Sequence, residues 1–361
     1  MNLVRATPFH MRAADANRLN AWSVRNGWTL ATHYGDPHDE ALAARLSVAV
    51  ADISWRWRVA IEGPRVEEFL ARLLTRDAAK LSPGCAFKAL WLTDQGGLRG
   101  AGLVARTGEQ SFLLASAAPD MEWVASAAAL FDVHVREAEE GGLALVGPYA
   151  SKLVAAAGLD ANLEPLAFRK QNWDGLDVTL SRWGQHGGYE LWCNADDAPI
   201  VWDRIARAGE AFALSPAGLE AMDIIDLEAG VPRPGRDYDP AAEPSPRLLG
   251  LESLIDPEHR IFNGRAAYLA APTKRVLAGV EFDSDTPAPF APLFRAGLIV
   301  GQTLGSLYSP ALRRAIALAQ LDAGASEPGC ELTLRLAPDL RIVTVRVTAL
   351  PFLPTPVQIS P

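Results

Sequence analysis

Cysteine is scarce in this sequence, which contains only Cys85, Cys193 and Cys330, all far apart. No pair of them has the C-x-x-C spacing of a thiolate metal site, and no cluster of histidines and carboxylates indicates a metal. Isolated cysteines in a reducing compartment are mostly small buried hydrophobes. We therefore predict buried cysteines, no metal centre and a cytoplasmic location.

Long apolar runs and basic clusters are missing as well. No stretch of 18 or more apolar residues occurs, and the first residues contain no apolar core typical of a signal peptide. The net charge is −9, whereas a nucleic-acid-binding protein needs a concentrated basic face. The sequence therefore argues against membrane and nucleic-acid partners, and it leaves the oligomeric state open.

The 361 residues, 49% of them hydrophobic, are sufficient for two or three packed modules. Residues 36–49 have helical spacing, and residues 50–61 alternate apolar and polar side chains as a strand does. An apolar stripe after Pro64 predicts a second helix. The pair Gly96-Gly97 separates two apolar runs, which predicts a hairpin.

The pattern of strands and helices continues into the second half of the chain. Residues 176–194 predict another hairpin, and residues 216–229 predict a helix that Ser215 caps and Gly230 ends. A Pro-rich loop follows at 232–247. Beyond residue 274 the chain is rich in short apolar strands, as in a small sandwich or barrel.

Six segments carry a resemblance to a known family. In order and spacing they resemble the T-protein aminomethyltransferases and their relatives, which include folate-dependent demethylases. The segments are ADISWRWRVAIEGPRVEEFLARLLTRDAAKLSPG (51–84), TDQGGLRGAGLVAR (93–106), GGYELW (187–192), GLEAMDIIDLEAGVPRPGRDYD (218–239), FNGRAAY (262–268) and IVGQTLGSLYSPALRRAIALA (299–319).

The resemblance implies an α+β fold of three domains, arranged as a cloverleaf around a central channel that admits the pterin of tetrahydrofolate. It places a discontinuous first domain at residues 1–50 plus 140–270 and a second domain at 51–139. The third is the C-terminal β-barrel-like domain at 274–361. The activity it implies is transfer of a one-carbon unit from a small molecule.

Several residues depart from the family pattern. The carboxylate pair after the first hairpin is replaced by Gly100 and Ala101, and a tyrosine before it by Lys88. A pterin-binding glutamate aligns with His186, and an arginine of the family aligns with Asp226. A histidine of the family also aligns with Trp55. A neutral imidazole offers one acceptor where a carboxylate accepts two hydrogen bonds, so pterin binding should be weakened.

The departures define the candidate catalytic residues. His186, with an ordinary pKa near neutrality, is either an acid–base group or a locally bonded histidine. Arg99 and Lys88 either bind a phenolate or carboxylate or are solvated surface charges. Asp226, which shares a helix face with Asp223, is either a general base or a solvated side chain. The catalytic candidates are His186, Arg99 and Asp226.

Tryptophan is frequent in the chain, and aromatic walls suit a flat substrate. On a strand over 50–61, Trp55 and Trp57 would point to one face, either as a pocket wall or as core. Gln185 is a further candidate polar contact. The predicted substrate-binding residues are Trp55, Trp57, Lys88, Trp91, Trp183, Gln185 and Tyr189.

Three functions remain open from the sequence. The first is an enzyme that removes a one-carbon unit from a small aromatic substrate without folate, releasing formaldehyde from a hydroxymethyl group. The second is a tetrahydrofolate-dependent O-demethylase or methyltransferase. The third is a non-catalytic folate-binding protein. The predicted cofactor is accordingly either none or tetrahydrofolate.

Overall fold

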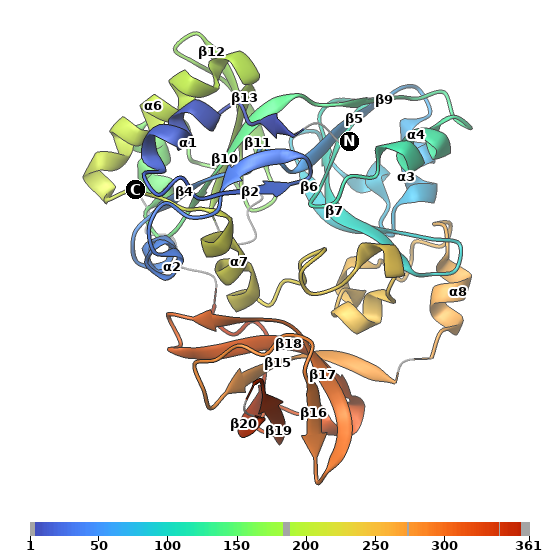
Figure 1. The fold of residues 1–361 in the computed structure, drawn as a ribbon. Helices are drawn as coiled ribbons and strands as arrows, with labels where there is room; N and C mark the ends of the chain where they lie inside the picture. Colours follow the sequence, from blue (N-terminus) through green and yellow to red (C-terminus); the bar gives the residue numbers. More distant parts are fainter. Residues whose placement is uncertain (1–3, 183–187, 273, 339, 355–361) are drawn as a thin grey trace.

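The computed structural model describes residues 4–182, 188–272, 274–338 and 340–354. Helices and strands are mixed along the chain, and four sheets organise them (Figure 1). A barrel lies at one end of the molecule, and a six-stranded and a five-stranded sheet lie side by side at the other. None of the helices in the described residues is long and apolar enough to cross a membrane.

The largest open sheet has six strands in the order β11-β12-β13-β10-β4-β14. Helices α5 (Ala150–Ala156) and α6 (Ala198–Gly209) pack their apolar sides on it, forming a core with the strands. The strands are β4 (Ala49–Asp52), β10 (Glu140–Val146), β11 (Phe168–Trp173), β12 (Leu176–Ser181), β13 (Tyr189–Asn194) and β14 (Ser215–Pro216).

The second sheet has five strands in the order β6-β7-β8-β5-β9. Apolar residues at helical spacing on α3 (Val66–Leu73) pack on this sheet together with α4 (Met121–Ala128). The strands are β5 (Trp57–Glu62), β6 (Ala86–Leu92), β7 (Leu98–Arg106), β8 (Ser111–Ser116) and β9 (His134–Glu137).

The C-terminal part is a closed six-stranded barrel, in the order β15-β18-β17-β16-β19-β20. Alternating residues fill its interior, as the pattern of β19 shows most clearly. Its strands are β15 (Arg275–Phe282), β16 (Pro292–Arg295), β17 (Leu298–Ser309), β18 (Arg314–Asp322), β19 (Glu331–Leu336) and β20 (Arg341–Thr348). Helix α8 (Arg265–Ala270) precedes the barrel.

A small N-terminal sheet completes the fold, with β1 (Arg5–Ala6), β2 (Trp22–Arg25) and β3 (Trp28–Ala31) in the order β1-β3-β2. Helix α1 (His10–Ala16) lies between β1 and β2 in the sequence, and α2 (Pro37–Leu46) follows β3. Helix α7 (Leu219–Glu228) lies between the upper sheets and the barrel (Figure 1), where it contacts α2, β17 and β18.

Most of the predicted elements are confirmed. Helices α2 and α3 lie where the apolar spacing predicted them, and both hairpin strand pairs are antiparallel. The α+β class with a C-terminal barrel is confirmed as well. The domain boundaries at 50, 140 and 274 stay a prediction.

The strand predicted over 50–61 is wrong, because two strands in different sheets replace it. Asp52 accepts hydrogen bonds from the backbone N–H of Ser54 (2.9 Å) and from its hydroxyl (2.6 Å), and this turn ends β4. The chain re-enters a strand only at Trp57. Trp55 therefore lies in a turn and does not share a strand face with Trp57.

Two smaller predictions also need correction. The helix predicted from 216 begins at Leu219 with Gly218 as its N-cap, because Ser215 and Pro216 pair with β4 instead. Its predicted end at Gly230, which has φ +70°, is confirmed. Among the cysteines, Cys193 is buried, but Cys85 is exposed.

A buried carboxylate ties helix α7 to its neighbours. The Glu228 side chain is 1% exposed and accepts hydrogen bonds from Arg45 Nε of α2 and from the Ser309 hydroxyl of β17, both at 2.5 Å. One carboxylate thus joins three elements. A buried charge without such partners would be strongly unfavourable.

We predict that Glu228→Ala lowers the free energy of unfolding by about 3–5 kcal/mol, because Arg45 loses the partner of a largely buried charge. Glu68→Ala is the matched control, since Glu68 binds Arg65 on the exposed surface, where a pair contributes less than about 1 kcal/mol. Urea unfolding measures both. Equal losses for the two variants would contradict the anchoring role of Glu228.

Candidate active site

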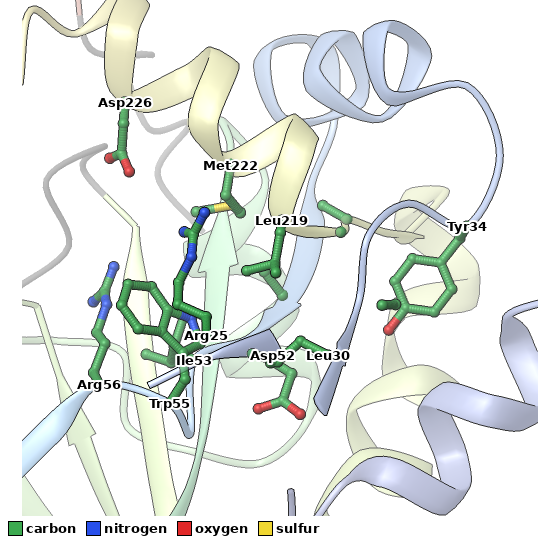
Figure 2. Close-up of a pocket in the computed structure, with 14 residues that line it drawn as sticks. Arg25, Leu30, Tyr34, Asp52, Ile53, Trp55, Arg56, Leu219, Met222 and Asp226 are labelled. Carbon is green, nitrogen blue, oxygen red and sulfur yellow. The ribbon is translucent and has the colours of Figure 1, made fainter. Parts of the chain in front are cut away.

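A cavity of about 420 Å³, counted out to its open mouth, lies where α7, the turn after β4 and the N-terminal sheet meet. Figure 2 shows Arg25, Trp55 and Arg56 on one side and Asp226 and Met222 of α7 on the other. The wall combines apolar surface with a few charged groups.

Helix α7 contributes one face to the cavity. Leu219, Met222 and Asp226 line it and are three and four residues apart, so they lie one above another on the helix. Asp223, one position further round, instead binds Arg25. The sequence predicted a shared face for Asp223 and Asp226, but only Asp226 lines the cavity.

A tight hairpin positions Trp55. Asn26 and Gly27 both have positive φ between β2 and β3, which is the backbone of a two-residue hairpin turn. The Asn26 amide donates to the carbonyl oxygens of Trp55 (3.2 Å) and Ala117 (2.8 Å). The Arg25 guanidinium then lies over the Trp55 ring, 4.9 Å from its centroid. These contacts hold the indole at the cavity wall.

Lys88 is a half-buried amine with charged neighbours. Burial lowers its pKa, and the charge of Arg56 lowers it further, whereas Glu190 and Asp226 oppose the shift. Within the described parts of the chain, its amine has no hydrogen bond or ion pair. The lowered pKa makes the neutral amine, which can accept a proton, easier to reach for Lys88 than for an exposed lysine.

Arg56 is paired, unlike Lys88. It donates a 2.5 Å hydrogen bond to Glu190, and the other oxygen of that buried carboxylate accepts from Trp192 Nε1. This pair fixes Arg56 at the cavity wall. Lys88 does not itself line the cavity, but the charges of Arg56 and Asp226, which do, act on its pKa.

The two faces of β6 and β7 separate Lys88 from Trp91. Paired residues point to the same face, so Trp91 lies with Gly100 on one face and Leu90 with Ala101 on the other, which is also the face of Lys88. Trp91 is fully buried in the core of the five-stranded sheet. It is not part of the cavity wall.

Gly100 is covered by the Trp91 indole. A Cβ at Gly100 would lie 2.2 Å from the indole ring, so no side chain fits there without repacking. Ala101 faces away from the indole and is only half-buried. Of the two positions where the resemblance places carboxylates, Ala101 is therefore the one on the face of Lys88.

Three other predicted residues have structural partners in the described chain. Arg99 forms two 2.8 Å hydrogen bonds to Asp120 and lies over Trp123. Trp57 donates to Glu137 from a core position. Tyr189 is buried and donates to the carbonyl oxygen of Ala161. None of the three lines the cavity, and their functional roles stay predictions.

The remaining predicted positions cannot be placed. Trp183, Gln185 and His186 lie outside the described residues. Their roles in catalysis and substrate binding stay predictions.

Sequence reasoning missed Arg25, Arg56 and Tyr34 as cavity residues. The signal for Arg25 was the Asn-Gly pair that follows it, which is typical of a hairpin turn. Burial, and next the charge of Asp52, raise the pKa of Tyr34, so its phenol stays protonated at neutral pH. No local pattern marked Arg56 or Tyr34, because only the fold brings them to α7.

Comparisons with known proteins agree with this architecture, which is that of an enzyme that handles one-carbon units. Residues 13–257 match the model of the GCVT N-terminal domain, and residues 275–353 match that of the glycine cleavage T-protein C-terminal barrel domain. The chain therefore belongs to the aminomethyltransferase family of glycine-cleavage T-proteins.

The individual relatives are distant but match over nearly their full length. The chain is 34% identical to an aminomethyltransferase of Frankia alni, over 90% of this chain and 92% of the relative, and 30% identical to that of Bacillus subtilis, over 90% and 93%. Glycine cleavage system aminomethyltransferase T from Bartonella henselae has the same fold, with a TM-score of 0.89 at 24% identity. That match covers 99% of this chain and all of the other.

The described residues include only some of the positions that the resemblance assigns to the folate channel, because His186, which aligns with the pterin-binding glutamate, lies outside them. Ala101 stands where the resemblance expects a carboxylate, and its methyl group accepts no hydrogen bond. The oxygens of Asp52, another cavity carboxylate, already accept from Thr7 and Ser54. Within the described part of the wall, Asp226 is the remaining carboxylate.

We predict that a carboxylate is tolerated at position 101 and not at position 100. Gly100→Asp pushes against the Trp91 ring and should destabilise the fold by about 1–3 kcal/mol or more. Ala101→Asp should be less destabilising than Gly100→Asp, because no indole ring fills the space there, although the side chain lies beside the apolar cluster of Leu90 and Leu98. Its charge should raise the pKa of Lys88. Thermal unfolding of both variants is the measurement. Equal stability of the two would show that Trp91 does not block position 100.

Proposed function

We propose that the chain removes a one-carbon unit from a small aromatic molecule and releases it as formaldehyde, without tetrahydrofolate. The observation that carries the proposal is the unpaired, half-buried Lys88 amine on the strand face where Ala101 replaces a carboxylate. An amine thus stands where the resemblance places a tyrosine, next to strand positions at which the resemblance places carboxylates.

The step needs a base and an electron sink in the substrate. Neutral Lys88 takes the proton of a hydroxymethyl O–H group, the C–O bond becomes a carbonyl, and the C–C bond breaks. Formaldehyde leaves from a benzylic carbon of the substrate, and the electron pair left on that carbon is delocalised into the adjacent aromatic ring. That carbon then takes the proton back from the Lys88 ammonium, so no oxidant or acceptor is required. General base catalysis of this kind contributes about 10²–10⁴-fold.

The cavity wall supports an aromatic substrate. Trp55 offers a flat ring, and Met222 and Leu219 of α7 add apolar surface opposite it. The phenol of Tyr34 is a hydrogen-bond donor in the same cavity. His186 remains a second candidate for handling the proton.

Family membership favours a second candidate function, the transfer of a one-carbon unit to tetrahydrofolate. The relatives named above are aminomethyltransferases. Residues outside the described ranges, among them His186, would then have to supply the contacts that Ala101 does not. The two functions differ in the fate of the carbon.

We predict that a phenolic, hydroxymethyl-bearing aromatic compound is turned over in the absence of folate, with one formaldehyde released per product. The measurement is an assay with folate omitted, in which formaldehyde is detected colorimetrically. Boiled protein is the control for spontaneous loss. Strict dependence on tetrahydrofolate, with methyl- or methylenetetrahydrofolate formed in step with product, would favour the second function instead.

Lys88 should set the pH dependence of that reaction. The neutral amine is the active form, so kcat/KM should rise with pH through the Lys88 pKa, which burial places below its ordinary 10.5. Lys88→Ala should slow turnover at least about 100-fold and remove this limb of the profile. Lys88→Arg should not restore it, because a guanidinium stays charged.

His186→Ala is the parallel variant for the second proton-transfer candidate. If kcat/KM still rises with pH in Lys88→Ala but no longer does so in His186→Ala, His186 is the group that takes the substrate proton.

A further inference from the structure

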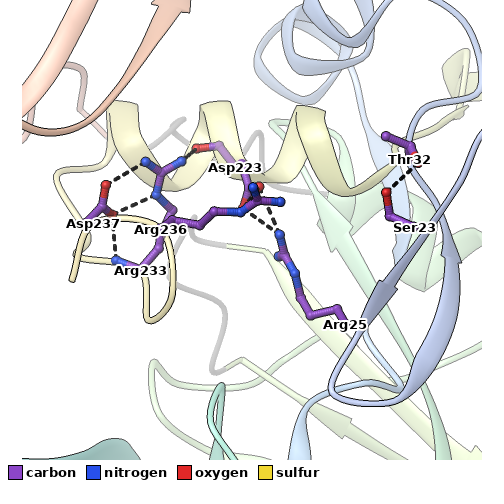
Figure 3. A network of polar contacts seen from close by, with 7 residues as sticks. All are labelled: Ser23, Arg25, Thr32, Asp223, Arg233, Arg236 and Asp237. Atoms are coloured by element: carbon purple, nitrogen blue, oxygen red, sulfur yellow. Dashed lines mark hydrogen bonds and ion pairs between the residues drawn. The ribbon is translucent and has the colours of Figure 1, made fainter. Parts of the chain in front are cut away.

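Two arginines share one carboxylate, and one of the two, Arg25, lines the cavity (Figure 3). Arg25 Nη2 contacts both oxygens of Asp223, at 3.2 and 2.9 Å, and Arg236 Nε lies 3.5 Å from one of the same oxygens. The Asp223 side chain is 9% exposed, and that of Arg236 is 56% exposed. The group therefore carries one more positive charge than negative charge.

Two neighbouring arginines each form an ion pair with a carboxylate outside this cluster. Arg233 binds both oxygens of Asp237 and donates to the backbone carbonyl of Asp223. Across the cavity, Arg56 binds Glu190. Neither pair supplies a further carboxylate to Arg25 or Arg236. Asp226, on the same helix as Asp223, is another carboxylate in the cavity wall, which Arg25 also lines.

Arg25 has N–H groups that donate to no described residue. Both of its hydrogen bonds come from Nη2, and within the described ranges its Nε and Nη1 have no partner. Arg25 lines the cavity, and its guanidinium lies over the Trp55 ring. A planar guanidinium with free N–H groups suits a carboxylate, which it can bind through two parallel hydrogen bonds.

We propose that Arg25 and Arg236 form an anion subsite that binds a carboxylate group of the substrate while its aromatic ring lies against Trp55. The ligand class is thus an aromatic carboxylate. This inference rests on the proposed function for what happens to the molecule after it binds. Binding itself requires no turnover and can be measured separately.

Asp223 has a defined part in this subsite. It neutralises one of the two positive charges and so competes with the substrate carboxylate for the same arginines. Removing its charge should strengthen anion binding, whereas a purely structural ion-pair cluster would gain nothing. This difference in sign separates the two interpretations.

The experiment titrates the full chain with benzoate and with benzamide, its neutral isostere, by calorimetry. Wild type should bind benzoate at least about tenfold more tightly than benzamide. Arg236→Ala should weaken benzoate binding severalfold without changing benzamide binding, and Asp223→Asn should strengthen it. Arg236 is exposed, so its variant should keep the fold, which thermal unfolding verifies.

Arg65→Ala is the matched control. Arg65 also pairs with one carboxylate, that of Glu68, and lies over an aromatic ring, that of Phe131, but it is remote from the cavity wall. It should leave both affinities unchanged. Equal affinities for benzoate and benzamide, or equal effects of Arg236→Ala and Arg65→Ala, would overturn the subsite. Preferential benzoate binding without formaldehyde release would uphold the subsite and reject only the lyase reaction.

Discussion

The contact of Glu228 with Arg45 and Ser309 is the constraint on which the cavity depends. It fixes the C-terminal end of α7 to α2 and to the barrel through a single buried carboxylate. Because α7 is a rigid helix, fixing its end also sets the position of Asp226, half a turn earlier, and of Met222 beyond it. The geometry of the cavity therefore rests on an ion pair that does not touch it.

Much of the fold could be predicted from the sequence, because it follows local patterns. Apolar spacing predicted α3, and the Gly96-Gly97 pair predicted the β6–β7 hairpin. The alternation over 50–61 failed, because the Asp52–Ser54 turn breaks it, and a period of two gives no sign of such a break. A turn of this kind depends on side-chain hydrogen bonds that hydrophobic patterns do not record.

The candidate site was less accessible to sequence reasoning. Aligning positions with a family found Trp55 and Asp226, which line the cavity, and Lys88, which does not. That alignment could not separate Trp91, which is core, from residues of the cavity wall. Arg25 comes from a hairpin about 200 residues away from its partner Asp223 in the sequence. Only the fold brings the two together, so no local pattern contains the information.

The Trp91–Gly100 contact links the loss of a carboxylate at position 100 of β7 to the packing of its neighbour β6. The indole fills the space that a side chain at position 100 would need, so glycine and tryptophan are coupled across the two strands. Trp91 also leaves its own buried Nε1 without a partner among the described residues, a cost of about 1–3 kcal/mol. The Trp91 ring leaves no room for a side chain at position 100, so glycine is favoured there. A carboxylate on the face of Lys88 would have to come from position 101. The chemistry of the cavity is therefore set partly by packing on the opposite face of the same sheet.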